Sequence, residues 1–347
     1  MLEDSDKTAI RSVLVQMVLE FPEASAHEQQ YLLTKLNATL ISIVKFEWRT
    51  TWRSFIPDIC THALVSQLKC ENALNILRMM SEEIFDFSKN QILQSEVRQL
   101  KEQMIEQFMR VNELCYWVLN QALTTQINPS LVKSCLKALQ AYLSWIPLNF
   151  IFNTDLMSNL IEHFILPIQS RNEAIKCVTE IASLTFEELD AQDPMRLHCR
   201  MKLCHYYCQF IKKITELTKN RSLTDEYASV KKSQQQTGFE NFARQLALAI
   251  SAVIKNNADL IEQSTNVMES NADIHFLRNS VNLGLRYMVQ LSHIPEEELF
   301  KICLDFWHWF SHDVLLKTKQ QYFQEAPLVP GMDFGFAATV SKTSYLH

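Results

Sequence analysis

Glycine is scarce in this chain and confined to its C-terminal part. The 347 residues contain only four glycines, and none of them precedes Gly238. Phosphate-binding loops and tight turns between strands depend on glycine, because they need backbone φ angles that other residues rarely adopt. The chain before Gly238 therefore has little room for a nucleotide-binding fold or for a sheet with short turns.

Apolar residues instead recur at the spacing of amphipathic helices along most of the chain. One such run is Val97, Leu100, Met104, Phe108, Val111, Cys115 and Val118. We expect about twelve helices from this periodicity. If they pair as hairpins, the first helices of the pairs begin near residues 27, 70, 129, 171, 238 and 296. Some of the steps between these starts match the roughly 40 to 47 residues of a HEAT or armadillo repeat. The sequence thus predicts an all-α fold, an α-solenoid of HEAT-type helical hairpins.

Two helix starts carry recognisable capping chemistry. Asn128 followed by Pro129 fits an N-cap with proline in the first helical turn. Ser170 with Glu173 fits a capping box, in which each side chain satisfies one amide of the first turn.

Polar and glycine-containing stretches divide the chain. We predict helical repeats over residues 27–217, a polar linker over 218–237 and further repeats over 238–314. Residues 315–347, which hold two of the four glycines, are predicted to form a divergent tail. The linker and the tail are both expected to be mobile.

Charge and cysteine content exclude several classes of function. The formal net charge is −6, so the whole molecule lacks the positive field that direct binding of nucleic acid needs. The nine cysteines are spread through helical patterns and are interpreted as reduced thiols. The longest apolar stretch, 145–152, is far shorter than the roughly 20 residues of a membrane-spanning helix, so we expect no membrane insertion.

No residue pattern supports an enzyme or a cofactor. The sequence contains no phosphate-binding loop, dinucleotide fingerprint or glycine-flanked serine, so we expect no catalytic residues. The densest set of metal-ligating residue types is His198, Cys199, Cys204, His205 and Cys208. Structural zinc sites usually take paired ligands from turns that wrap the ion, whereas these residues share one predicted helix. We therefore predict that no zinc is bound there.

An aromatic group lies around one helix-to-helix junction. Trp48, Trp52 and Phe55 belong to it. Aromatic side chains bury large areas on folding, so packing between neighbouring repeats is the expected role of these three residues.

Specific phrases of the sequence resemble a known family. They are FEWRTTWRSFIPDI (46–59), SEEIFDFS (81–88), WIPLNFIF (145–152), RNEAIKCVTEIA (171–182) and EEELFKICLDFW (296–307). In this order they resemble the N-terminal third of exportin-1, a family of karyopherin-β nuclear export receptors built from HEAT repeats. The resemblance covers roughly residues 8–314 and is poor over 185–237.

The resemblance implies a function in nucleocytoplasmic transport. Family members bind Ran-GTP together with cargo that carries a leucine-rich nuclear export signal, contact nucleoporins, and shuttle between nucleus and cytoplasm. It also implies that residues 1–26 form part of a first repeat, that further helices precede them, and that the cargo groove belongs to repeats beyond this chain.

Among the helices that the resemblance places toward Ran are 49–66 and 95–123, with Arg98, Lys101 and Glu102 as contact candidates. The alternative is a generic α-solenoid scaffold subunit that does not bind Ran.

Overall fold

The computed structural model describes residues 4–21, 29–48, 51–85, 94–144, 146–186, 189–190, 193–219, 221–266 and 272–325. Contacts divide the chain into two units, Met1–Ile302 and Cys303–His347. The described residues form helices and contain no strand. The all-α prediction is therefore confirmed.

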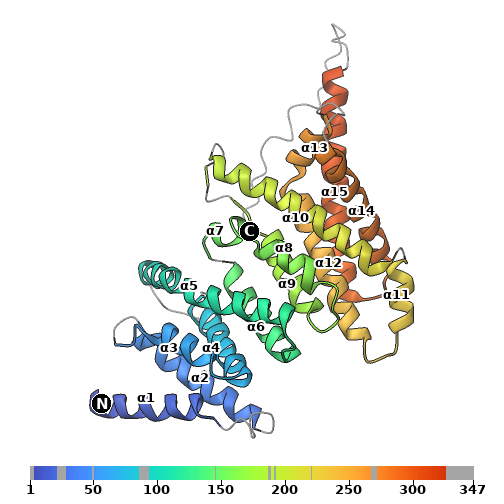
Figure 1. Ribbon diagram of the computed structural model, residues 1–347. Helices are drawn as coiled ribbons and strands as arrows, with labels where there is room; N and C mark the ends of the chain where they lie inside the picture. The colour runs from blue at the N-terminus through green and yellow to red at the C-terminus, as the bar shows by residue number, and fades with distance from the viewer. Residues whose placement is uncertain are drawn as a thin grey trace. The chain divides into compact units, whose positions relative to one another are not determined.

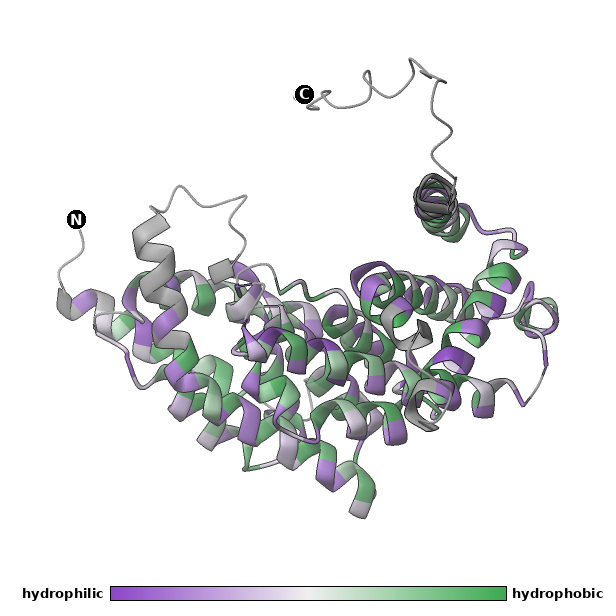
Figure 2. Ribbon diagram, turned by 90° about the horizontal axis from the view of Figure 1, so that it is seen from above, coloured by the Kyte–Doolittle hydropathy of each residue, from purple (hydrophilic) through white to green (hydrophobic). Residues whose placement is uncertain are grey.

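The helices follow one another along the chain with short connections (Figure 1). They are α1 (Asp4–Leu19), α2 (Gln30–Glu47), α3 (Phe55–Ala63), α4 (Gln67–Phe85), α5 (Gln94–Thr124), α6 (Pro129–Leu143), α7 (Asn149–Phe152), α8 (Leu156–Asn159), the π-helix η2 (Leu160–Phe164), α9 (Arg171–Ala182), α10 (Pro194–Thr218), α11 (Leu223–Val230), α12 (Gln236–Asn256), α13 (Ala258–Asn266), α14 (Ala272–Ser292) and α15 (Glu297–Glu325). Hydrophobic and hydrophilic residues interleave along them, as expected of amphipathic helices (Figure 2).

Within the first unit the helices pack as two rows. One row contains α2, α4, α6, α9 and α12, each in contact with the next. The other row begins with α3 and α5, which contact each other, and continues with α8, η2, α10 and α14. In this part of the row, α10 contacts η2 on one side and α14 on the other. Hairpin partners across the rows are α1 with α2, α3 with α4, α5 with α6, η2 with α9, and α10 with α12. This arrangement confirms the α-solenoid prediction.

The predicted order of helices is wrong for the hairpins expected to begin near residues 70 and 129. The helices that begin near residues 70 and 129 were expected to open hairpins, but α4 and α6 are the second members of theirs. The connections explain the difference. Only a few residues separate α3 from α4 and α5 from α6, and short connections join antiparallel neighbours, whereas longer segments precede α3 and α5.

The two predicted helix caps have different outcomes. Asn128 caps α6 as expected, because its side chain accepts a hydrogen bond from the Ser130 amide and Pro129 occupies the first turn. The capping box at Ser170 is wrong. The Ser170 hydroxyl donates to the carbonyl oxygen of Phe164 at 2.9 Å instead, so it closes the turn that follows η2.

The segment expected to be a mobile linker contains a helix. Ser222 caps α11 by accepting a hydrogen bond from the Thr224 amide, and the apolar pair Leu223 and Tyr227 is buried where α11 contacts α12 and α14. The residues around Leu223 and Tyr227 are mostly polar, so the composition of this segment predicted a linker although the two apolar residues have helical spacing. Two buried side chains are enough to fix such a short helix on its neighbours.

The last helix is longer than the sequence predicts. α15 continues past residue 314 to Glu325, because neither glycine nor proline interrupts the chain until Pro327. In the second unit, its rings Phe306, Trp307 and Phe310 lie against one another, with Phe306 and Phe310 stacked at 5.8 Å. The rest of the predicted tail, from residue 326, lies outside the described residues.

Candidate binding surfaces

The residues predicted to face Ran lie on α5. Arg98, Lys101 and Glu102 all belong to this helix of 31 residues. Only Glu102 has a described side chain, and it is exposed; the side chains of Arg98 and Lys101 lie outside the described residues. Contact of these three residues with Ran stays a prediction.

A groove with a largely apolar lining lies between α3 and α5. It has a volume of 470 Å³ and is lined by Pro57, Cys60, Thr61, Leu64, Arg110, Glu113, Leu114 and Trp117. Leu64 is 58% exposed and Trp117 is 41% exposed, so both apolar side chains are available to a partner. Arg110 and Glu113 pair with each other at 3.1 Å on α5 and leave the rim without net charge. Such a recess can take an uncharged apolar side chain of another protein.

The groove exists because α3 is short. α3 has only nine residues, five of which are buried: Phe55, Ile56, Ile59, Cys60 and Ala63. α5 runs on beyond the end of α3, and Trp117 on this flank of α5 stays 41% exposed among the described helices.

The three aromatic residues predicted at a repeat junction occupy different environments. Trp48 is buried at the end of α2, and its indole N–H donates to the Gln107 side-chain oxygen at 3.3 Å. Phe55 is fully buried in α3, and Trp52 is half-buried with its ring edge-on to Phe55 at 4.8 Å. The structure brings Trp52 and Phe55 together. Their contribution to stability stays a prediction.

Trp52 also lines a second groove, between α1 and α3. Arg11 of α1 lies over the Trp52 ring at 5.3 Å and pairs with Glu47 at 2.8 Å. On the same groove, His62 of α3 hydrogen-bonds the carbonyl oxygen of Leu19 at 2.9 Å. These contacts tie α1 to the next hairpin, so this groove of 490 Å³ is held in shape by polar contacts as well as by packing.

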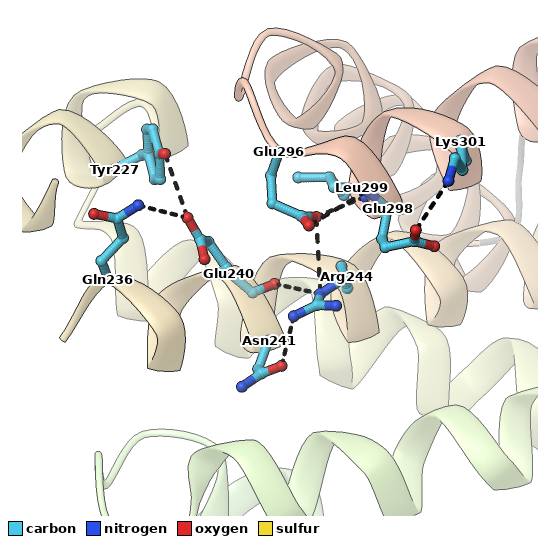
Figure 3. Close-up of polar contacts among 9 residues, drawn as sticks. All are labelled: Tyr227, Gln236, Glu240, Asn241, Arg244, Glu296, Glu298, Leu299 and Lys301. Carbon is cyan, nitrogen blue, oxygen red and sulfur yellow. Dashed lines mark hydrogen bonds and ion pairs between the residues drawn. The ribbon is translucent and has the colours of Figure 1, made fainter. Parts of the chain in front are cut away.

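A polar cluster joins α12 to the start of α15, and sequence reasoning missed it (Figure 3). Glu296 accepts hydrogen bonds from the amides of Leu299 at 2.7 Å and Glu298 at 3.3 Å, so it caps α15. Its carboxylate also lies 3.8 Å from the guanidinium of Arg244 on α12, which in turn donates to Asn241 at 2.8 Å. The cluster orients the start of α15 on α12.

The candidate zinc ligands do not converge. Cys199, Cys204 and Cys208 are buried, whereas His198 and His205 are exposed on the other side of α10. Burial raises the pKa of the Cys204 thiol to about 12, which opposes the thiolate form that binds zinc. In the described part of the chain no three His, Cys, Asp or Glu side chains are placed to hold a metal ion.

No helix among the described residues is long and apolar enough to cross a membrane.

Comparison with known proteins gives consistent matches along the chain. The sequence profile of the family described as "Exportin 1-like protein" matches residues 29–178, and that of "Chromosome region maintenance or exportin repeat" matches residues 279–314. The first range runs from the start of α2 into α9, and the second runs from α14 into α15.

Individual relatives extend the match to nearly the whole chain. Protein EXPORTIN 1A of Arabidopsis thaliana is 30% identical over 99% of this chain and 30% of its own length. Protein EXPORTIN 1B of the same plant is 33% identical over 88% of this chain and 26% of its own length. Exportin-1 of Schizosaccharomyces pombe is 30% identical over 95% of this chain and 28% of its own length. The alignments therefore reach beyond the range 8–314 that the sequence phrases indicate.

This chain spans only 26 to 30% of the length of these relatives. The profile matches, the alignments over nearly the whole chain and the two-row helical fold agree, and the chain belongs to the exportin-1 family.

Proposed function

We propose that this chain is a segment of a nuclear export receptor that binds Ran-GTP and, as part of a complete receptor, carries cargo with a leucine-rich nuclear export signal. The observation that carries the proposal is the alignment of nearly the whole chain with exportin-1 proteins of a plant and a yeast. The family relation also favours a binding protein over an enzyme, and a protein that shuttles between nucleus and cytoplasm and contacts nucleoporins.

The fold suits a receptor of this kind. In a solenoid each hairpin contacts only its neighbours, so small rotations between hairpins add up and binding at one place changes the curvature elsewhere. The contacts of the first unit run from each hairpin to the next. Ran-GTP and cargo can therefore be coupled through the curvature of the complete receptor.

The proposed Ran contact is α5. Arg98, Lys101 and Glu102 follow one another at a spacing that places them on neighbouring faces of this helix. The α3–α5 groove lies further along the same helix, so a partner that covers α5 would also reach Trp117. Arginine and tryptophan are the side chains that most often dominate the binding energy of protein interfaces.

Affinity for Ran is expected to be low in this chain alone. A receptor that encloses its partner gathers affinity from several separated patches, and linked patches raise the overall affinity by roughly 10²- to 10⁴-fold. The chain spans about 30% of the length of EXPORTIN 1A. By the family resemblance its cargo groove belongs to later repeats, so no stable complex with an export-signal peptide is expected.

A pull-down with immobilised Ran tests the proposal. Ran-GTP is expected to retain the chain and Ran-GDP is not, with Arg98→Glu/Lys101→Glu weakening retention and Lys35→Glu/Lys133→Glu leaving it unchanged as a matched control. Lys35 and Lys133 are exposed lysines on α2 and α6. Equal retention by both nucleotide forms, or none by either, would favour the scaffold that does not bind Ran.

A further inference from the structure

Positive charge is concentrated in one part of an otherwise acidic chain. Residues 196–232, from α10 to the turn after α11, contain nine Lys and Arg residues and three Asp and Glu residues. The whole chain carries a formal net charge of −6. This segment is therefore basic, and the rest of the chain is strongly acidic.

Two of the nine cations form ion pairs within the described part of the fold. Arg200 pairs with Asp259 and donates to Asn257 at 3.2 Å. Lys213 is only 8% exposed and pairs with Glu162 at 2.7 Å and Glu216 at 3.0 Å. These two side chains hold α10 against its neighbours and are not available to a partner.

Other cations of the segment face solvent. Lys202, Lys212, Lys219 and Arg221 form no ion pair with any residue that the structure describes, and the last three are exposed. On α10, His198, Lys202, His205 and Lys212 follow at intervals of four, three and seven residues, which places them on one face.

This line of side chains continues past the end of α10 with two further cations. Lys219 caps the helix in the left-handed conformation, and the Arg221 amide donates back to the carbonyl oxygen of Thr218 at 2.8 Å. We call His198, Lys202, His205, Lys212, Lys219 and Arg221 the basic face. From His198 to Lys219 it extends roughly 30 Å at the rise of an α-helix. Figure 1 shows α10 leading into α11 at this end.

We propose that the basic face binds an acidic, extended segment of a partner protein. Lys202 and Lys212 lie on one face of α10, Lys219 caps the end of the helix and Arg221 follows it, so together they attract a chain with carboxylates at similar intervals. The C-terminal end of the α10 dipole offsets only about half a charge, which leaves the cations in excess. Leu197 and Met201, 50% and 61% exposed on the same helix, offer apolar contact beside the charges.

The surroundings favour a protein partner over a nucleic acid. Glu162 and Glu216 line the groove beside Lys212 and interrupt the positive charge. A phosphate backbone is charged at every nucleotide, whereas a peptide can place uncharged residues opposite these two carboxylates. Tight binding of nucleic acid also draws on about six to ten phosphate contacts, more than this face supplies. A peptide can instead place its carboxylates opposite the cations and its apolar side chains on Leu197 and Met201.

Fluorescence anisotropy with a labelled peptide rich in Asp and Glu tests the proposal, and Ran is not needed for it. We expect salt-sensitive binding that Lys212→Glu/Lys219→Glu weakens about tenfold or more, because each reversal replaces an attraction by a repulsion. The control Lys35→Glu/Lys133→Glu makes the same change of net charge on exposed lysines of α2 and α6 and should leave affinity unchanged.

Three results would overturn the proposal. One is equal weakening by the control pair, which would mean that only the net charge matters. Another is that the acidic peptide binds no better than a matched peptide with Asn and Gln in place of the acids. The third is tighter binding of a single-stranded oligonucleotide than of the acidic peptide, which would assign the face to nucleic acid.

Discussion

Gly284 lies where α14 crosses α10, and adding a single methyl group there is expected to destabilise the fold. A Cβ atom at Gly284 would lie 1.9 Å from the hydroxyl oxygen of Tyr207 and 3.2 Å from its Cζ. Tyr207 is buried, and its hydroxyl donates to the carbonyl oxygen of Ser280 at 3.4 Å, one turn before Gly284. The ring therefore has no free space into which it can move.

Two opposing effects determine how much Gly284→Ala changes the free energy of unfolding. Replacing glycine by alanine inside a helix favours folding by roughly 0.5 to 1 kcal/mol, because the unfolded chain loses backbone freedom. Overpacking a filled core costs about 1 to 3 kcal/mol. Since the overlap with Tyr207 is severe, Gly284→Ala should lower the free energy of unfolding by about 1 to 2 kcal/mol net.

Gly238→Ala is the matched control. Gly238 also lies within a helix, α12, but a Cβ atom there would meet only the side-chain nitrogen of Asn172 at 3.8 Å, an ordinary contact. This variant should be neutral or more stable by up to about 1 kcal/mol. Adding Tyr207→Phe to Gly284→Ala removes the closest contact and should restore part of the loss.

Urea unfolding followed by circular dichroism measures these differences. Because a solenoid need not unfold in one step, hydrogen exchange of the α14 amides provides a local second readout. If Gly284→Ala has the unfolding midpoint and α14 exchange rates of Gly238→Ala, the close packing of α10 on α14 is not as described.

Three further predictions concern stability and thiol chemistry. Phe55→Ala should cost about 3 to 5 kcal/mol and Trp52→Ala less, because Phe55 is fully buried and Trp52 half-buried; equal shifts in thermal melting would contradict this ranking. Glu296→Ala should cost about 1 to 2 kcal/mol through loss of the α15 cap and of the pair with Arg244, and an unchanged urea midpoint would refute that role. Burial raises the pKa of Cys204 from 9.0 to about 12, so the folded state holds its proton where the unfolded state loses it. Stability should therefore fall as the pH rises above 9, and this thiol should react with a thiol reagent only on unfolding; rapid labelling of the native chain would show that it is accessible.

The helical class of the fold could be predicted because its signal is local and repeated. Apolar residues at helical spacing and the lack of glycine act within each segment, and the cap at Asn128 involves neighbouring residues only. The order of helices within the hairpins depends on which neighbours pack more closely, and periodicity does not carry that information. Ser170 shows the same limit, because its partner, Phe164, belongs to the preceding helix η2 and not to the capped helix α9.

The candidate surfaces were less predictable than the fold. A sequence pattern cannot tell that Trp117 is left uncovered, since this follows from the short length of α3 beside α5. The cap at Glu296 was missed because glutamate is an uncommon N-cap, although its position directly after Pro295 is a usable signal. The basic face was hidden by the net charge of the whole chain, which averages a basic segment with an acidic remainder.

Calorimetric titration of the purified chain with Ran tests the central claim most directly. The chain should bind Ran-GTP weakly and with measurable preference over Ran-GDP, and Arg98→Glu/Lys101→Glu should reduce that preference. Binding that is the same for both nucleotide forms, or absent with both, would contradict the assignment of this segment as a Ran-binding part of an export receptor.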